Sequence, residues 1–259
     1  TYYVPADRNQ LVGCLPEGAV GAEVGVFADD FVATILAGAK PRELHMIDAW
    51  RFVGYDWRNP PAHVPESQHA AIMRYLKSAV PAWETEDPSD GLAMLYDRVR
   101  ERFAGDDRVR VARGLSGEVL ASYPEESFDF LYLDADHDYH SVLSDLWAAA
   151  RILKPGGLQL GRDFDMDRRN RYSNHNVIEA VLSFCTNSGF RMIALSADLG
   201  STFVLARAQS SPMLSGFVQR LIGRSWSIVE IPQEIVRNHR RVPDRLPDGR
   251  IGSFSSFQS

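Results

Sequence analysis

Residues 128–165 show the pattern of a strand, then of a helix, then of a second strand. The first segment, residues 128–133, is mostly apolar and stops at Asp134, which is typical of a central parallel strand that reaches the edge of a sheet. Apolar residues then recur every three or four positions and predict a helix with one buried face: Val142, Leu143, Leu146, Trp147, Ala150 and Leu153. Pro155, Gly156 and Gly157 end this helix, and residues 158–160 form the next strand.

Both strands of this unit end near an acidic residue, Asp134 after the first and Asp163 after the second. Because parallel strands end at the same edge of a sheet, we expect the two carboxylates to lie near each other. Ligands in open α/β sheets bind outside this carboxyl edge. The candidate functional site is therefore predicted at the ends of these strands.

The order of a strand, the run LDADHDY, a helix, the run LKPGG, a strand and an aspartate resembles class I S-adenosylmethionine-dependent methyltransferases. The closer likeness is to O-methyltransferases such as the catechol and antibiotic-sugar enzymes, and it covers roughly residues 15–207. The resemblance implies an α/β fold of the Rossmann-like, doubly wound type, with a mostly parallel seven-stranded sheet and an antiparallel closing strand. It also implies S-adenosylmethionine as the cofactor, bound by a domain spanning residues 1–207.

The first predicted strand, residues 20–27, carries Gly21 and Gly25 on either side of Glu23, and a strand-to-helix turn follows it. Small residues at such a turn let backbone amides approach a ligand closely. The resemblance implies that Glu23, Gly25 and Phe27 hold the methionine part of the cofactor, and Phe27 and Asp29 stand where the family often has further glycines. The alternative, that this is only a tight turn, stays open.

The second strand, residues 44–47, ends in Asp48, twenty-five positions after Glu23. An acidic side chain there can accept hydrogen bonds from both ribose hydroxyls. The resemblance places Ala49 or Trp50 near the adenine, and core packing is an equal alternative for Trp50. A third strand, residues 109–112, leads into further expected adenine contacts: Gly114, Leu115 and Ser116. We also expect Asp134 to contact the cofactor.

Methyl transfer to oxygen requires an acceptor hydroxyl to lose its proton, so the site needs a base. The resemblance points to His137 or Asp136, and the unperturbed pKa of histidine, near 6.5, suits the task. We expect His137 to be the base, with Asp136 as its orienting partner or substitute. The structural alternatives are that Asp134 caps a helix and that His137 is a surface residue of its first turn.

Many relatives in this group bind magnesium, and the resemblance assigns Asp134 and Asp163 as ligands here. Hard oxygen ligands suit this ion, which lowers the pKa of a coordinated hydroxyl. Phe164 occupies the position of a further ligand and cannot coordinate a metal. Asp165 offers a substitute, whereas Arg162 offers a cation that would neutralise Asp163 and make the metal unnecessary.

Composition limits the partners and the compartment. A formal net charge of −6 argues against a protein that grips nucleic acid over a broad surface. No apolar run is long enough to span a bilayer, and residues 1–10 lack a signal-peptide pattern. The only cysteines are Cys14 and Cys185, which rules out a disulfide framework or a cysteine-based zinc site. We therefore expect a cytoplasmic protein that binds neither nucleic acid nor a membrane.

Two segments stand apart from the domain pattern. Residues 52–90 are long, irregular and rich in proline, which makes them the candidate lid over the substrate. Residues 208–259 form a C-terminal extension in which apolar residues alternate with arginines, and it is a candidate contact with a second subunit. We therefore expect a homo-oligomer, with a dimer as the simplest case.

The sequence thus predicts an S-adenosylmethionine-dependent O-methyltransferase acting on a small hydroxylated molecule, such as a sugar or natural product. One alternative is a nicotinamide-dependent oxidoreductase. Asp29 and Asp30 disfavour it, because two carboxylates at the turn would repel a pyrophosphate. The other alternative is a scaffold or sensor that binds the cofactor without catalysis.

Overall fold

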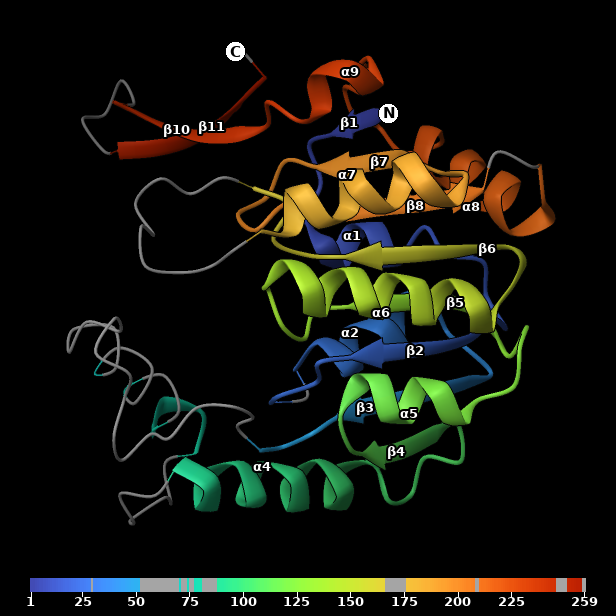
Figure 1. Ribbon diagram of the computed structural model, residues 1–259, viewed down its shortest axis with the longest axis vertical. Coiled ribbons are helices and arrows are strands. Elements are labelled where there is room, and N and C mark those ends of the chain that lie inside the picture. The colour runs from blue at the N-terminus through green and yellow to red at the C-terminus, as the bar shows by residue number, and fades with distance from the viewer. Residues whose placement is uncertain are drawn as a thin grey trace.

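A single sheet with helices on both faces forms the body of the protein (Figure 1). The computed structural model describes residues 1–28, 30–51, 70, 74, 77–80, 88–165, 176–207, 210–245 and 251–257. The strands of the sheet, in spatial order, are β4 (Val109–Arg113), β3 (Glu43–Asp48), β2 (Val20–Val24), β5 (Phe128–Leu133), β6 (Leu153–Gly161), β8 (Phe203–Arg207), β7 (Phe190–Ser196), β1 (Tyr2–Val4) and β9 (Val229–Glu230).

The direction of the strands confirms the predicted fold class. Strands β4, β3, β2, β5 and β6 are mutually parallel, and β8 runs antiparallel to both β6 and β7. These strands, together with β7, are the expected seven. The sheet is larger than expected, because β1 adds in parallel to β7 and β9 then pairs antiparallel with β1.

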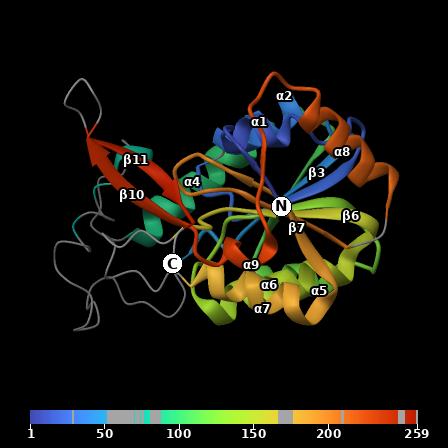
Figure 2. The same ribbon diagram turned by 90° about the horizontal axis from the view of Figure 1, so that it is seen from above.

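Two layers of helices cover the sheet (Figure 2). One face carries α1 (Arg8–Val12), α2 (Asp30–Gly38), α4 (Pro88–Phe103) and α8 (Pro212–Ile222). The opposite face carries α5 (Ser116–Ser122), α6 (Tyr139–Ile152) and α7 (Val177–Ser188). Side chains of β5 enter both layers: Phe130 and Tyr132 pack on the first side, Leu131 and Leu133 on the second. Because β5 is buried on both faces, its apolar pattern is that of a central strand.

The connection between α6 and β6 differs from the sequence prediction. The helix ends at Ile152, and β6 begins at once with Leu153 rather than at Leu158. Pairing with β5 shifts register between Phe128 and Phe130, so the glycine-containing run forms an irregular part of the strand. Gly156 adopts a φ of +78°, a conformation that few other residues tolerate.

Part of the C-terminal extension packs into the core of the domain. Helix α8 begins after Ser211, whose hydroxyl accepts a hydrogen bond from the Leu214 amide, and it buries Phe217 and Leu221 completely. The short helix α9 (Gln233–Val236) and the hairpin of β10 (Arg240–Arg245) and β11 (Ile251–Ser256) follow. The boundary at residue 207 between the domain and its C-terminal extension stays a proposal.

Most of the candidate lid, residues 52–90, lies outside the described residues.

Across the part of the chain that the structure describes, helices are too short or too polar to cross a membrane.

The packing of α8 gives a first prediction. Phe217→Ala should lower the free energy of unfolding by about 3–5 kcal/mol, because it removes a fully buried ring from the core. Ile222→Ala on the same helix, where the side chain is 57% exposed, should cost only about 0.5 kcal/mol. Urea unfolding measures both. Equal small effects would mean that α8 is not part of the folding core.

Candidate active site

The turn after β2 is held by the carboxylate of Asp48. Its Oδ2 accepts hydrogen bonds from the backbone amides of Val26 and Phe27, both at 2.9 Å, and its Oδ1 accepts one from the Trp50 amide at 2.6 Å. Phe27 and Trp50 both have positive φ, so these bonds stabilise a strained backbone. A carboxylate has about four acceptor positions, which leaves room for one further donor. Asp48 therefore shapes the turn in addition to its predicted role toward ribose.

The other predicted cofactor residues follow the same edge of the sheet, but two of them are buried. Trp50 is 1% exposed; its indole N–H donates to the Phe27 carbonyl, and its ring packs 5.1 Å from that of Tyr96. Glu23 lies within β2 and is 2% exposed. The geometry of Trp50 matches the core-packing alternative.

The ends of β3 and β4 place the expected adenine contacts together. The Gly114 amide donates to the Asp48 carbonyl at 2.9 Å, and the carbonyl of Ala49 accepts a weak hydrogen bond from Arg113 at 3.4 Å. Leu115 is the N-cap residue of α5, and Ser116 is the first residue of that helix. The structure thus brings the predicted residues of three separate loops to one rim.

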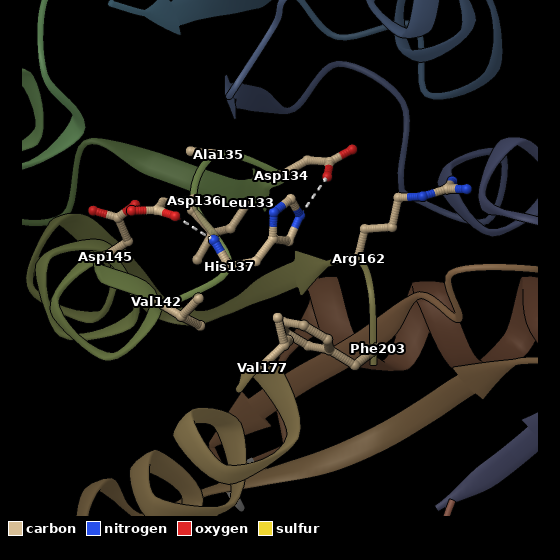
Figure 3. A pocket seen from close by; sticks show the side chains of 10 residues that line it. All are labelled: Leu133, Asp134, Ala135, Asp136, His137, Val142, Asp145, Arg162, Val177 and Phe203. Atoms are coloured by element: carbon tan, nitrogen blue, oxygen red, sulfur yellow. Dashed lines mark hydrogen bonds and ion pairs between the residues drawn. The ribbon is translucent and has the colours of Figure 1, made fainter. Parts of the chain in front are cut away.

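Asp134, His137 and Asp163 form a cluster at the ends of β5 and β6. The His137 Nε2 atom lies 2.7 Å from Oδ2 of Asp163. It also lies 3.9 Å from Oδ1 of Asp134 (Figure 3). The Asp134 amide donates to the Val24 carbonyl at 2.8 Å, which fixes this loop against β2. Asp163 has a φ of +60°, and its amide donates to the Gly200 carbonyl. The two carboxylates predicted to meet at the edge do so around the imidazole.

The cluster shifts the pKa values of its members. Burial, reinforced by the charge of Asp163, raises the pKa of Asp134 to about 6, against the opposing effects of His137, Arg162 and Arg8. Burial alone would lower the pKa of His137, but the hydrogen bond and charge of Asp163, with the charges of Asp134 and Asp136, raise it above the ordinary value of 6.5. Shifted pKa values within a cluster of ionisable groups at a sheet edge are typical of a functional site.

Asp136 has a different partner from the one expected. Its Oδ1 accepts hydrogen bonds from the His137 amide at 2.7 Å and the Asp138 amide at 3.4 Å, so it stabilises its own turn. The imidazole of His137 is paired with Asp163 instead. The N-cap of α6 is Asp138, which accepts bonds from the amides of His140 and Ser141. Asp134 is therefore not a helix cap.

Two arginines complete the charge balance of the cluster. Arg8, the first residue of α1, places Nη1 3.3 Å from Oδ2 of Asp134. Arg162 lies 3.9 Å from Asp163 and donates to the Leu199 carbonyl at 2.8 Å. The sequence pointed to Arg162, whereas residues 1–18 show no catalytic motif. Arg8 reaches Asp134 across 126 positions of the chain, and no spacing pattern marks such a contact.

The donor atoms of the cluster decide whether it fits a metal ion. Asp134, His137 and Asp163 each offer one ligand atom, and these atoms lie within 4.8 Å of one another. Magnesium prefers oxygen ligands in an octahedral arrangement, whereas one of these three donors is an imidazole nitrogen. Phe164 is fully buried, and Oδ2 of Asp165 accepts a hydrogen bond from the Gly200 amide at 3.0 Å. The described residues therefore do not fit a resident magnesium ion.

A cavity beside the cluster reaches a second buried acid, Asp145 on α6 (Figure 3). Burial raises the pKa of Asp145 to about 6, against the effect of a hydrogen bond with Ser116. The folded protein therefore binds a proton at Asp145 more tightly than the unfolded chain, whose carboxyl has a pKa near 3.9. Stability must then fall as pH rises from about 4 to about 6 and stay low above that range.

Asp145→Asn should remove this part of the pH dependence. The amide keeps a hydrogen-bond acceptor for Ser116, so we expect the variant to be more stable than wild type at pH 8 by roughly 1–3 kcal/mol. At pH 4.5 the difference should shrink or reverse. Urea unfolding at the two pH values measures it, with Asp97→Asn on α4 as an exposed control. A difference that does not change with pH would contradict the prediction.

The family of the chain follows from comparison with known proteins. Residues 22–164 match a family model described as a methyltransferase domain, and this is more than half of the 259 residues. The chain belongs to the class I S-adenosylmethionine-dependent methyltransferases. A methyltransferase is not an oxidoreductase, so the nicotinamide alternative is set aside. The search of curated proteins gives no match.

Solved methyltransferase structures are similar to this chain at low identity. One from Aquifex aeolicus, S-adenosylmethionine-dependent, has 14% identity and a TM-score of 0.45, over 77% of this chain and 92% of that one. The N-methyltransferase NodS of Bradyrhizobium japonicum, in complex with S-adenosylhomocysteine, has 14% identity and a TM-score of 0.48, over 77% and 85%. An O-methyltransferase family protein of Burkholderia thailandensis has 12% identity and a TM-score of 0.45, over 78% and 55%. The family assignment rests on the family model alone.

Proposed function

We propose that this methyltransferase transfers a methyl group from S-adenosylmethionine to a hydroxyl oxygen of a small molecule, such as a sugar or natural product. The observation that carries the proposal is the pairing of His137 with Asp163, 2.7 Å apart at the carboxyl edge of the sheet. A histidine held by a carboxylate in this way is a recurring arrangement for a general base.

The proposed reaction is a direct displacement at the methyl carbon. The acceptor oxygen forms a bond to the methyl carbon as the bond from carbon to the sulfonium sulfur breaks, and S-adenosylhomocysteine leaves. The proton of the hydroxyl passes to the imidazole of His137. Asp163 orients the ring and stabilises the imidazolium that forms, and Asp134 adds a second negative charge 3.9 Å away. The protein must also align the acceptor with the methyl group.

The presence of a base favours oxygen over nitrogen as the acceptor atom. A neutral amine already has a nucleophilic lone pair and can lose its proton after the methyl group has moved. A hydroxyl is a weak nucleophile until its proton is removed. A site that raises the pKa of a histidine with two neighbouring carboxylates is better suited to the second task.

The cofactor is proposed to lie along the rim formed by the ends of β2, β3, β4 and β5. The Gly25 turn would contact its methionine part, and Asp48 would accept one hydrogen bond from the ribose. The backbone of Gly114, Leu115 and Ser116 is proposed to line the adenine. Residues 52–90 remain the candidate lid and a dimer remains the proposed assembly.

Calorimetry with S-adenosylmethionine tests the cofactor, and Asp48→Ala should weaken binding at least about tenfold, since it removes both the ribose acceptor and the support of the turn. Formation of S-adenosylhomocysteine against a panel of hydroxylated compounds and matched amines then tests the acceptor. If S-adenosylmethionine does not bind, the proposal is wrong. If only amines are methylated, the acceptor atom is nitrogen rather than oxygen. If the cofactor binds but no compound is methylated, a scaffold or sensor is favoured.

A further inference from the structure

The N-terminal segment delivers a permanent positive charge into the candidate site. Nη1 of Arg8 lies 3.3 Å from Oδ2 of Asp134, and the two side chains are only 31% and 19% exposed. A guanidinium stays charged at any physiological pH and has five N–H donors. It can therefore hold one oxygen of Asp134 and still donate to another oxygen nearby.

Several contacts from different elements position Arg8, so it is unlike a surface arginine that pairs by chance. Its guanidinium lies over the ring of Phe31 on α2, 4.3 Å from the ring centre. Its backbone amide donates to Oδ2 of Asp198 at 3.3 Å. The preceding residue, Asp7, forms a capping box with Gln10 that fixes the start of α1. The side chain is thus preorganised to face Asp134.

The charges at the rim are already balanced without a metal. The cluster contains two carboxylates, Asp134 and Asp163, and two guanidinium groups, Arg8 and Arg162, lie within 4.0 Å of them. A divalent cation would place two more positive charges next to Arg8, which is unfavourable in a partly buried site. The arginine and a metal would compete for the carboxylate of Asp134.

Phe164 closes the position where a further ligand would be needed. Its ring is fully buried and stacks on His239 with the ring centres 6.3 Å apart and an interplanar angle of 22°. Nδ1 of His239 lies 2.7 Å from the Phe164 carbonyl, within hydrogen-bonding distance. The C-terminal part of the chain therefore holds an apolar side chain here, and a local rearrangement toward a third carboxylate would break these contacts.

We propose that Arg8 takes the place of a divalent cation in this site. It neutralises Asp134 and, when the acceptor binds, donates a hydrogen bond to the acceptor oxygen as negative charge develops there. The inference rests on the proposed function for the identity of that oxygen, but it makes a separate claim about metal binding. Arg8 excludes the metal from Asp134, so removing its charge should create an ion site that wild type lacks.

Manganese binding measured by electron paramagnetic resonance tests the claim without an acceptor. Arg8→Gln keeps much of the side-chain stem but loses the charge, and it should bind manganese at least about tenfold more tightly than wild type. Arg8→Lys keeps a positive charge and should behave like wild type. The double variant Arg8→Gln with Asp134→Asn should lose the gained affinity. Arg191→Gln, an exposed arginine on β7, is the matched control.

Two outcomes would overturn the proposal: tight manganese binding by the wild-type protein, or no gain in Arg8→Gln while that variant still binds S-adenosylhomocysteine. If Arg8→Gln does not fold, tight manganese binding by wild type or by Arg8→Lys would still overturn the proposal, because the proposal requires both proteins to bind the ion weakly. Titration of every variant with S-adenosylhomocysteine separates a failure of the proposed function from a failure of the proposal about Arg8. A wild-type protein that binds no S-adenosylhomocysteine would contradict the proposed function, whatever its behaviour toward manganese.

Discussion

Replacing Gly25 with alanine is expected to lower the free energy of unfolding by about 3–5 kcal/mol, the sum of a steric clash and backbone strain. Gly25 follows β2 with a φ of +89°, and an added Cβ would lie 2.1 Å from the Asp134 carbonyl oxygen and 2.6 Å from the Ala135 nitrogen. These are backbone atoms. They are held in place because the Asp134 amide donates to Val24, while the Gly25 amide donates to Ile47.

Gly18→Ala is the matched control for this change. Gly18 also has a positive φ, +74°, but an added Cβ would meet nothing within 4 Å. It should therefore show only the cost of the left-handed backbone, about 1 kcal/mol. Urea unfolding of both variants measures the difference in their losses of unfolding free energy. That difference reports how closely the turn at Gly25 approaches the loop after β5. Equal losses in the two variants would mean that the loops can separate and that the approach is not tight.

The central sheet could be predicted because its strands repeat one simple pattern. Strand β5 is mostly apolar and is followed by Asp134, β2 is followed by Gly25, and β3 ends at Asp48. Strands β1 and β9 could not be predicted, because three and two residues are too few to show a period. Strand β1 pairs with β7 and β9 pairs with β1, in both cases far along the chain, which a local pattern cannot encode.

The candidate site was predictable where it consists of strand ends and not where it depends on contacts between distant segments. Asp134, His137 and Asp163 come together because two neighbouring parallel strands end at one edge. Asp136 was expected as the orienting partner of His137 or its substitute, but Oδ1 of Asp136 accepts from the His137 amide. The sequence cannot show that a carboxylate one position away turns back to the main chain. Arg8 was missed because α1 carries no catalytic motif.

His137→Gln is expected to lower kcat by about 10²–10⁴-fold once an acceptor is known, because the variant loses the base that removes the hydroxyl proton. Binding of S-adenosylhomocysteine should stay within about twofold of wild type, since the imidazole is assigned to the acceptor rather than to the cofactor. Initial rates and calorimetry measure the two quantities. His140→Gln, an exposed histidine in the first turn of α6, controls for the loss of an imidazole near the site.

The pH profile distinguishes a base from a merely structural histidine. A base acts in its neutral form, so kcat/KM should rise with pH and reach half its maximum at the pKa of His137, above 6.5 because Asp163 and Asp134 raise it. Asp163→Asn removes the first of these charges and should move that midpoint to lower pH, while lowering the maximum. His137→Gln should abolish the rise altogether. A rise that persists in His137→Gln with the same midpoint would assign the base to another group, and Asp134, with its pKa raised to about 6, would be the first to examine.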